Sequence, residues 1–288
     1  MNPDSSTDQQ PLPPSLPRII QPWLRVVLFL AANLTLLSVL VALLFWGMDE
    51  SEFQTDLEEL YLIQIISLFV TCITVWLFRT YFDKSSILSL GFEWTNRVKD
   101  SVIGFGLGFA LIAVGTLLLM LLGELEISAI QFNFDLLLSY FILCIIIALN
   151  EEILVRGYVL NNLMQSMNKY WALVVSAMIF TLFHALNPNI SFLAVVNLQL
   201  AGMLLGIYYI HQQNLWFPIA LHTSWNFSEG AVFGYEVSGI DFQSLLQQNI
   251  SDTDWLTGGE FGFEGSLLLS ILLGLAILTT HKLYSPKT

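Results

Sequence analysis

Long apolar runs separated by short polar stretches dominate the hydropathy pattern of this chain. A helix needs about 20 consecutive, mostly apolar residues to cross a bilayer, and windows of that length predict eight membrane spans. They cover residues 26–46, 60–78, 102–122, 136–160, 171–186, 192–211, 215–233 and 266–283. Polar residues interrupt the fourth to seventh spans, whereas the other four spans are almost entirely apolar. The pattern therefore predicts an all-α fold, a polytopic membrane helix bundle.

The same pattern divides the chain into four parts. Residues 1–22 are polar and proline-rich, which predicts a disordered cytoplasmic tail. Residues 23–130 hold the first three spans, and residues 131–235 hold the four interrupted ones. Residues 236–288 contain a long outer loop and the last span. We expect the functional residues to lie in the third part, and the uninterrupted spans to serve as scaffold.

Composition supports the membrane assignment. Hydrophobic residues make up 55% of the 288 positions and charged residues only 11%, whereas a soluble domain carries about 25% charged residues. Cys72 and Cys144 both fall inside apolar runs. Two such cysteines indicate packing residues and exclude a disulfide framework or a cysteine-based zinc site.

The distribution of charge predicts the orientation. With a cytoplasmic N-terminus, all ten Lys and Arg residues fall in or beside cytoplasmic segments, and both termini are cytoplasmic. The four outer connections, around 49–59, 123–135, 187–191 and 234–265, contain no Lys or Arg. This is the positive-inside pattern of a multi-pass protein of the cell membrane. The net charge of −13 comes mostly from the acidic outer loops, so it gives no sign of a nucleic-acid partner.

The fourth span carries charges where hydrocarbon is expected. Glu151, Glu152 and Arg156 follow an apolar run, and each charge at bilayer depth costs at least about 2.5–3.5 kcal/mol, so such groups usually mark function. Glu152 and Arg156 are four residues apart and face each other on a helix, whereas Glu151 points about 100° away. We interpret Glu151 as the reactive carboxylate and the Glu152–Arg156 pair as its support. Glu152 as the reactive group is the alternative.

The depth of these charges depends on where the fourth helix ends. If it ended at Leu149, the charges would lie among the headgroups. If it continues to about Met164, Glu151 comes to nearly the same depth as His184 in the next span. Residues 158–160 and Leu163 are apolar enough for this, so we predict the longer helix, with Arg156 buried.

Two further spans supply polar side chains at helical spacing. Phe180 and His184 lie four residues apart in the fifth span, and His222 and Asn226 lie four apart in the seventh. Residues at this spacing share a helix face. A single intramembrane His usually serves as a hydrogen-bonding residue between helices. Together with Glu151, the set predicts a shared polar pocket.

This ordered set of motifs resembles the signature of the CAAX-protease and bacteriocin-processing (CPBP, or Abi) intramembrane peptidases. The resemblance covers residues 136–233, and the motifs match in order and internal spacing. It implies a bundle of about eight helices and a catalytic site formed by Glu151, His184, His222 and Asn226. The implied activity is that of a CAAX prenyl endopeptidase-like enzyme. Implied substrates are prenylated or otherwise lipidated peptides, peptide precursors or membrane proteins, met in membrane lipid.

The residue types suit peptide hydrolysis, which needs an activated water and donors for the developing oxyanion. We expect Glu151, helped by His184, to accept the proton of the water. His222 and Asn226 are then the oxyanion donors. In a second model, Glu151, His184 and His222 bind zinc, with the fourth position left for water. The sequence leaves this choice open.

Two other classes of protein use similar residues. A proton- or ion-coupled transporter also carries intramembrane Glu, His and Asn, but it more often shows an internal repeat of broken helices, which this chain lacks. A non-proteolytic scaffold of the same fold is the other alternative. Such a scaffold would lack a motif residue, whereas all are present.

Overall fold

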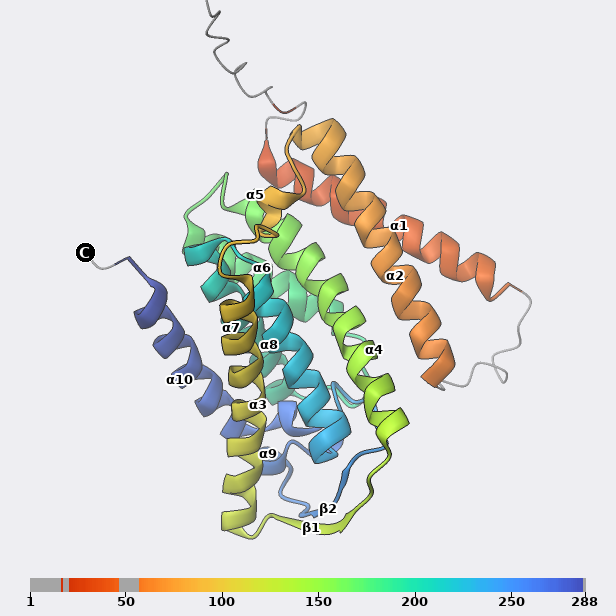
Figure 1. Ribbon diagram of the computed structural model, residues 1–288, viewed down its shortest axis with the longest axis vertical. Helices are drawn as coiled ribbons and strands as arrows, with labels where there is room; N and C mark the ends of the chain where they lie inside the picture. The colour runs from red at the N-terminus through yellow and green to blue at the C-terminus, as the bar shows by residue number, and fades with distance from the viewer. Residues whose placement is uncertain (1–16, 18–20, 47–56, 287–288) are drawn as a thin grey trace, which may run out of the picture.

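Helices dominate the computed structural model, which describes residues 17, 21–46 and 57–286 (Figure 1). The long helices are α1 (Pro22–Leu44), α2 (Leu57–Leu77), α3 (Arg97–Leu122), α4 (Phe134–Glu152), α6 (Lys169–Phe183), α7 (Phe192–Gln212), α8 (Trp216–Asn226) and α10 (Leu267–Tyr284). The short helices are α5 (Asn161–Leu163) and α9 (Asp254–Thr257). The all-α membrane bundle predicted from the sequence is confirmed. The predicted disordered tail lies almost entirely outside the described residues.

Six helices in the described part of the chain are long and apolar enough to cross a membrane. The other two predicted spans, the fifth and the seventh, do not meet this criterion. Helix α6 has only 15 residues, and α8 continues as a π-helix, Phe227–Phe233, with polar residues along its length. Helix α6 is apolar and exposes Trp171, Met178 and Leu182, so it differs from the six by its length alone. Helix α8 is mostly buried inside the bundle and therefore needs less apolar surface than a helix that faces lipid. The count of eight spans is therefore approximate.

The fourth helix runs without a break from Phe134 to Leu163. Its α-helical part ends at Glu152, and a π-helix, Ile153–Leu160, joins it to α5. The predicted extension to about Met164 is thus confirmed, and Arg156 is fully buried. The π-helix was not predicted, because hydropathy does not distinguish i→i+5 from i→i+4 bonding. Segments of this kind occur frequently at functional sites.

Helix α8 lies at the centre of the bundle, in contact with α3, α4 and α7. Small residues allow the close approach of α3. A Cβ atom at Gly104 would lie 2.3 Å from the carbonyl oxygen of Phe217, and one at Gly108 would lie 2.5 Å from that of Leu221. Gly202 on α7 meets Ala177 on α6 in the same way. These glycines therefore allow neighbouring helices to pack closely.

The outer helices present apolar side chains to their surroundings. Leu43 on α1 is 65% exposed and Leu278 on α10 is 67% exposed, as is typical of helices that contact lipid. Figure 1 shows α1 and α2 standing beside α4 at the edge of the bundle. Exposed apolar residues on the periphery and buried polar residues at the centre describe a multi-pass membrane protein.

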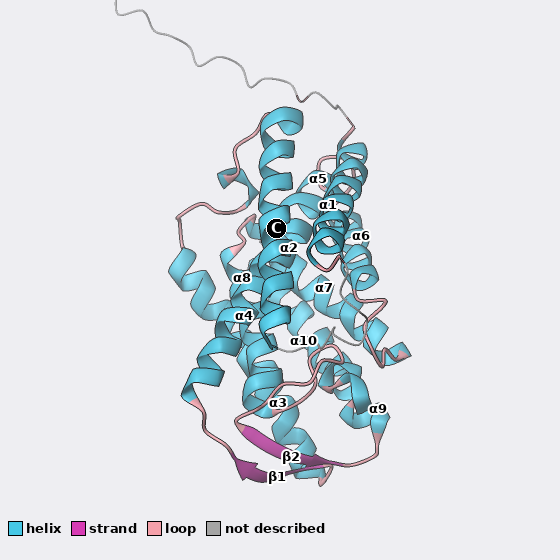
Figure 2. Ribbon diagram, turned by 90° about the vertical axis from the view of Figure 1, so that its right-hand side faces the viewer, coloured by secondary structure: helices cyan, strands magenta, loops and turns pink. Residues whose placement is uncertain are grey.

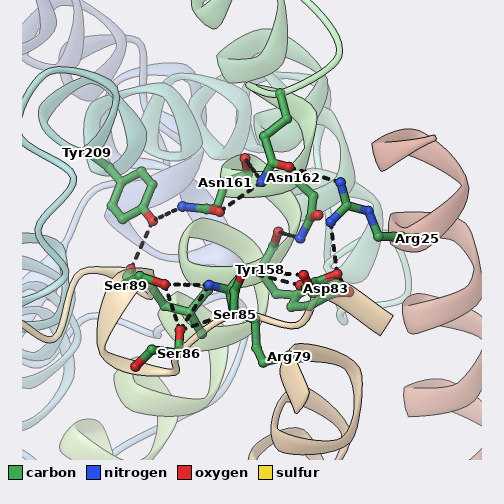
Figure 3. A network of polar contacts seen from close by, with 12 residues as sticks. Arg25, Arg79, Asp83, Ser85, Ser86, Ser89, Tyr158, Asn161, Asn162 and Tyr209 are labelled. Atoms are coloured by element: carbon green, nitrogen blue, oxygen red, sulfur yellow. Dashed lines mark hydrogen bonds and ion pairs between the residues drawn. The ribbon is translucent and has the colours of Figure 1, made fainter. Parts of the chain in front are cut away.

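A buried polar network joins α1 and α2 to the fourth helix (Figure 3). Asp83 is the last residue of the π-helix Phe78–Asp83, which extends α2. Its carboxylate forms ion pairs with Arg25 at 3.0 Å and with Arg79 at 3.1 Å. The hydroxyl of Tyr158 donates to the same carboxylate at 3.2 Å. Because both arginines meet one carboxylate away from water, the network fixes these helix ends relative to one another.

The opposite end of the bundle carries a small sheet, seen at the bottom of Figure 2. Strands β1 (Leu125–Ile130) and β2 (Leu246–Ile250) pair antiparallel, with Leu125 opposite Ile250 and an irregularity between Ile127 and Ala129. The strands join two predicted outer connections that are far apart in sequence. Hydropathy did not predict the sheet, and it holds the long outer loop against the bundle.

Candidate active site

The junction between α4 and its π-helix carries the central ion pair. Arg156 Nη1 donates to Glu152 Oε1 at 2.7 Å, and neither side chain is exposed. The predicted i, i+4 pair is present. Arg156 Nη2 donates to the carbonyl oxygen of Gly202 at 3.1 Å, and the guanidinium lies 4.5 Å from the centre of the Phe180 ring. The buried cation is thus compensated by one carboxylate, one carbonyl and one aromatic face.

His222 on α8 contacts both glutamates of the fourth helix. Its Nδ1 lies 3.0 Å from Glu152 Oε1, and its Nε2 lies 3.9 Å from Glu151 Oε2. Since Glu152 is engaged with Arg156, it acts as an acceptor for the Nδ1–H group and fixes the orientation of the ring. The Nε2 atom is the one that faces Glu151.

Glu151 differs from Glu152 in its surroundings. Its side chain is 26% exposed, and Oε2 has no hydrogen-bond partner. The Glu152 carboxylate, in contrast, is sealed behind Arg156 and His222. The sequence left two candidates for the reactive group. Each glutamate has an Oε2 atom without a hydrogen-bond partner, and the difference between them is that only the Glu151 side chain is partly exposed.

His184 lies directly after the last residue of α6, one turn beyond Phe180. Its Nδ1 atom is 2.9 Å from the carbonyl oxygen of Phe180 and donates to it. That hydrogen bond leaves Nε2 as the ring atom with a free lone pair. The ring also packs on Phe180, with centroids 4.6 Å apart, so the predicted shared face of Phe180 and His184 is present.

One cavity of about 410 Å³ brings the predicted residues together. Glu151, His184, His222 and Asn226 all line it, from three different helices. Glu152 and Arg156 are not on its wall and lie behind it. Asn226 is the last residue of α8, immediately before the π-helix Phe227–Phe233, just as Glu152 immediately precedes the other π-helix. The convergence predicted from the sequence is therefore observed.

The rest of the cavity wall is mostly apolar. Helices α1 and α2 contribute side chains at helical spacing, among them Leu34, Val41, Leu60 and Ile63. The long outer loop also takes part in the wall, through Val237, Ser238, Ile240 and Phe242. This loop therefore helps to enclose the cavity.

Two buried acidic residues beside Trp225, of which Glu264 lines the cavity, were missed by the sequence analysis. Glu229 is fully buried and Glu264 is 7% exposed. The indole N–H of Trp225 donates to both, at 2.9 Å and 3.1 Å. Glu229 follows His222 by seven residues, two helical turns, within a predicted span. The same reasoning that selected Glu151, a carboxylate at membrane depth, would have selected Glu229.

The predicted zinc ligands are not gathered into a metal site. Within the part of the chain that the structure describes, no three His, Cys, Asp or Glu side chains are grouped closely enough to hold a metal ion. The Nδ1 atom of His222 is occupied by Glu152 and that of His184 by Phe180. Metal dependence stays a prediction.

A comparison with protein families gives a match over the same region. Residues 133–228 match the family described as type II CAAX prenyl endopeptidase Rce1-like. The matched segment begins just before α4 and ends just beyond Asn226, so it contains every predicted site residue. The family resemblance predicted from the motifs is confirmed. A comparison with curated proteins finds no match.

Proposed function

We propose that this chain is a CAAX-type intramembrane endopeptidase that hydrolyses a peptide bond of a membrane-associated peptide or protein, with prenylated or otherwise lipidated chains among its candidate substrates. The family match supports a CAAX-type protease in general. One geometric observation carries the assignment of residues. A free carboxylate oxygen of Glu151 and the Nε2 atom of an oriented His222 face each other at 3.9 Å on the wall of a buried cavity.

In the proposed reaction, Glu151 is the general base. The 3.9 Å separation exceeds a direct hydrogen bond, and it suits a water molecule that contacts both Glu151 and His222. Glu151 takes one proton from this water, and the resulting hydroxide attacks the carbonyl carbon of the substrate. When the carbon–nitrogen bond breaks, Glu151 returns the proton to the leaving amine.

The oxyanion that forms in this step needs hydrogen-bond donors. Protonated His222 donates its Nδ1–H to Glu152 and its Nε2–H toward the cavity. The carboxamide of Asn226, one helical turn away on the same face, supplies a second donor. His184 presents Nε2 to the same cavity and supports proton transfer from the other side.

The Glu152–Arg156 pair has a positioning role in this proposal. Arg156 neutralises Glu152, so that Glu152 Oε1 accepts from both Arg156 and His222 without adding a second uncompensated negative charge beside Glu151. Zinc bound by Glu151, His184 and His222 is a separate proposal for activating the water, and chelation with 1,10-phenanthroline tests it. If activity is lost on chelation and restored by Zn²⁺, the water is activated by zinc and the metal-free reaction proposed above is wrong.

The apolar wall contributed by α1 and α2 supports a substrate that is itself embedded in membrane lipid. The test compares membranes of cells that produce the wild-type protein with membranes that contain Glu151→Gln. We expect new C-termini of membrane proteins or lipidated peptides only with the wild type. The variant should have unchanged thermal stability in detergent. Equal sets of C-termini from two folded proteins would overturn the proposal.

The same two proteins also separate the transport alternative from the peptidase. Both are reconstituted into liposomes that contain a pH-sensitive dye and a labelled membrane peptide. Cleavage without proton flux supports the peptidase, whereas flux without cleavage supports a transporter. A non-proteolytic scaffold would show neither signal with wild-type protein.

A further inference from the structure

A stripe of polar residues follows one face of α2, a helix whose span was predicted to serve only as scaffold. Its members recur at intervals of three or four residues, which places them on one helix face. They are Gln64, Ser67, Thr71 and Thr74. Polar groups at membrane depth are costly, so each is expected to have a partner or a function. The last three are used inside the bundle, through hydrogen bonds to Asn150, Asn33 and the carbonyl oxygen of Val70.

Gln64 is the exception in this stripe. Its carboxamide has no hydrogen-bond partner among the residues that the structure describes. The side chain is partly exposed and lines the cavity that also holds Glu151. A carboxamide has two N–H donors and an oxygen with two lone pairs. This wall of the cavity therefore keeps unused donors and an unused acceptor.

The position of Gln64 relative to Glu151 follows from the contact between α2 and α4. Ser67, one turn or about 4.5 Å along the helix axis from Gln64, accepts from Asn150 at 2.8 Å. Asn150 directly precedes Glu151, and the axes of packed helices lie about 8–10 Å apart. Gln64 is therefore on the order of 10 Å from Glu151. Because an extended peptide advances about 3.3 Å per residue, a substrate cut beside Glu151 would meet Gln64 within about three residues of the cleaved bond.

The main chain of a peptide in this cavity needs such partners. Each N–H or C=O group that leaves water without a new hydrogen bond is strongly unfavourable in an apolar site. The roles proposed for Glu151, His222 and Asn226 serve only the bond that is cut. The wall formed by α1 and α2 is otherwise mostly Leu, Ile and Val. Gln64 interrupts this wall with a group that can both donate and accept.

We infer that Gln64 is a substrate-binding residue, whose carboxamide pairs with main-chain N–H and C=O groups of an extended peptide near the cleaved bond. The inference rests on the proposed peptidase function and adds a mode of substrate recognition to it. Recognition of the main chain does not depend on which side chain the substrate carries at that position. The hydrogen bond between Asn150 and Ser67 holds α2, and with it Gln64, against the helix that carries Glu151.

The probes are a farnesylated CAAX peptide and its depsipeptide forms, in each of which an ester oxygen replaces one N–H group within three residues of the cleaved bond. Values of kcat and KM are measured in nanodiscs for the wild type and for Gln64→Met, in which the side chain keeps its length but cannot form these hydrogen bonds. Loss of a neutral hydrogen bond predicts a KM about three- to tenfold higher for Gln64→Met with the parent peptide, and a nearly unchanged kcat.

The depsipeptides test whether Gln64 contacts the main chain directly. With the wild type, one ester form should show a similar rise in KM. With Gln64→Met the same ester should cause no further rise, because the hydrogen bond is already absent. Gln131→Met makes the same substitution at an exposed position outside the cavity and should behave as the wild type with every peptide.

Binding of the same peptides to Glu151→Gln, with and without Gln64→Met, separates the inference from the function on which it rests, because binding needs no cleavage. An ester effect on Kd that disappears with Gln64→Met, without cleavage by the wild type, would support the inference and count against the peptidase. Cleavage with an unchanged KM for Gln64→Met, or with ester effects that persist in it, would overturn the inference and leave the peptidase standing. If Gln64→Met fails to fold, equal KM values for all peptide forms with the wild type would also overturn it.

Discussion

At the scale of single residues, one oxygen atom organises the site. Glu152 Oε1 accepts from Arg156 at 2.7 Å and from His222 at 3.0 Å. A buried carboxylate is stable only with such partners, and the partners in turn are oriented by it. The site is therefore a unit, in which removal of one member leaves the others unpaired.

Loss of the Glu152 carboxylate should destabilise the protein strongly. In Glu152→Ala the Arg156 guanidinium stays buried without its countercharge, so we expect a loss of about 3–5 kcal/mol. The double variant Glu152→Ala/Arg156→Met removes both charges and should recover part of this loss. Reversible unfolding in mixed detergent measures both. A double variant as unstable as the single one would contradict this account of the pair.

Loss of the Asn226 carboxamide should affect the reaction more than the fold. As a proposed oxyanion donor, Asn226 acts mainly on the transition state, so Asn226→Ala should lower kcat about 100- to 1000-fold. KM should change little. Steady-state kinetics on a cleaved membrane peptide gives both values. A rise in KM with unchanged kcat would place Asn226 in substrate binding instead.

Sequence reasoning reached four polar residues of the cavity wall and missed others, among them Asn33, Gln64 and Asn150. Glu151, His184, His222 and Asn226 were predicted to share a pocket because helical spacing fixes their faces and span length fixes their depth. Glu264 was not predicted, since it lies in an irregular segment whose path is set by tertiary contacts. Glu229, like Glu151, is a carboxylate within a predicted span, but it was not recognised as a candidate.

At the scale of elements, close contact between α3 and α8 sets the position of the helix that carries His222 and Asn226. The contact depends on glycines of α3. The Cβ of any other residue at Gly108 would overlap the backbone of α8, at 2.5 Å from the Leu221 carbonyl oxygen. The position of α8 is therefore sensitive to bulk on α3.

A large residue at Gly108 should separate the two helices. We expect Gly108→Leu to destabilise the protein by about 1–3 kcal/mol and to reduce peptidase activity by displacing α8. Gly106→Leu is the matched control, because a Cβ atom at Gly106 meets nothing within 4 Å. Unfolding and activity are measured for both variants. Equal effects of the two substitutions would exclude the packing explanation.

Helix boundaries were predicted less well than helix positions. The extension of the fourth helix to Leu163 followed from a depth argument that used Glu151 and His184. The change to π-helix after Glu152 and after Asn226 had no signal in the hydropathy pattern. Such changes depend on which carbonyl groups find partners in the packed bundle, and neighbouring helices decide that.

At the scale of the whole molecule, charge distribution predicts how the bundle sits in the bilayer. Apart from the buried Arg156, the Lys and Arg residues that the structure describes lie near one set of helix ends, whereas the β1–β2 sheet joins the opposite ends. Six apolar helices support the multi-pass arrangement. The orientation itself stays a prediction of the positive-inside rule.

Cysteine labelling in intact cells tests this orientation. In a background with Cys72→Ala and Cys144→Ala, a membrane-impermeant maleimide should label Ser128→Cys on β1 from outside the cell. Thr95→Cys, beside the start of α3, should be labelled only after the cells are permeabilised. Both positions are exposed. The reversed labelling pattern would place both termini outside the cytoplasm.

The outer sheet and the path of the long loop were the largest features that the sequence did not predict. The pairing of Leu125 with Ile250 joins segments more than a hundred residues apart. Two short strands without a strong alternating pattern give little local signal, and their partners become neighbours only after the helices have assembled.

The position of Arg156 bears on how the chain is made. Its countercharge, Glu152, lies on the same helix and one turn earlier, so the two neutralise each other as soon as that helix forms. The segment can leave the translocon as a unit without net charge from this pair, before the ribosome has synthesised α8 and its histidine. Had the countercharge been placed on α8 instead, an unpaired guanidinium would have had to wait in hydrocarbon for about sixty further residues of synthesis, at a cost of about 2.5–3.5 kcal/mol or more.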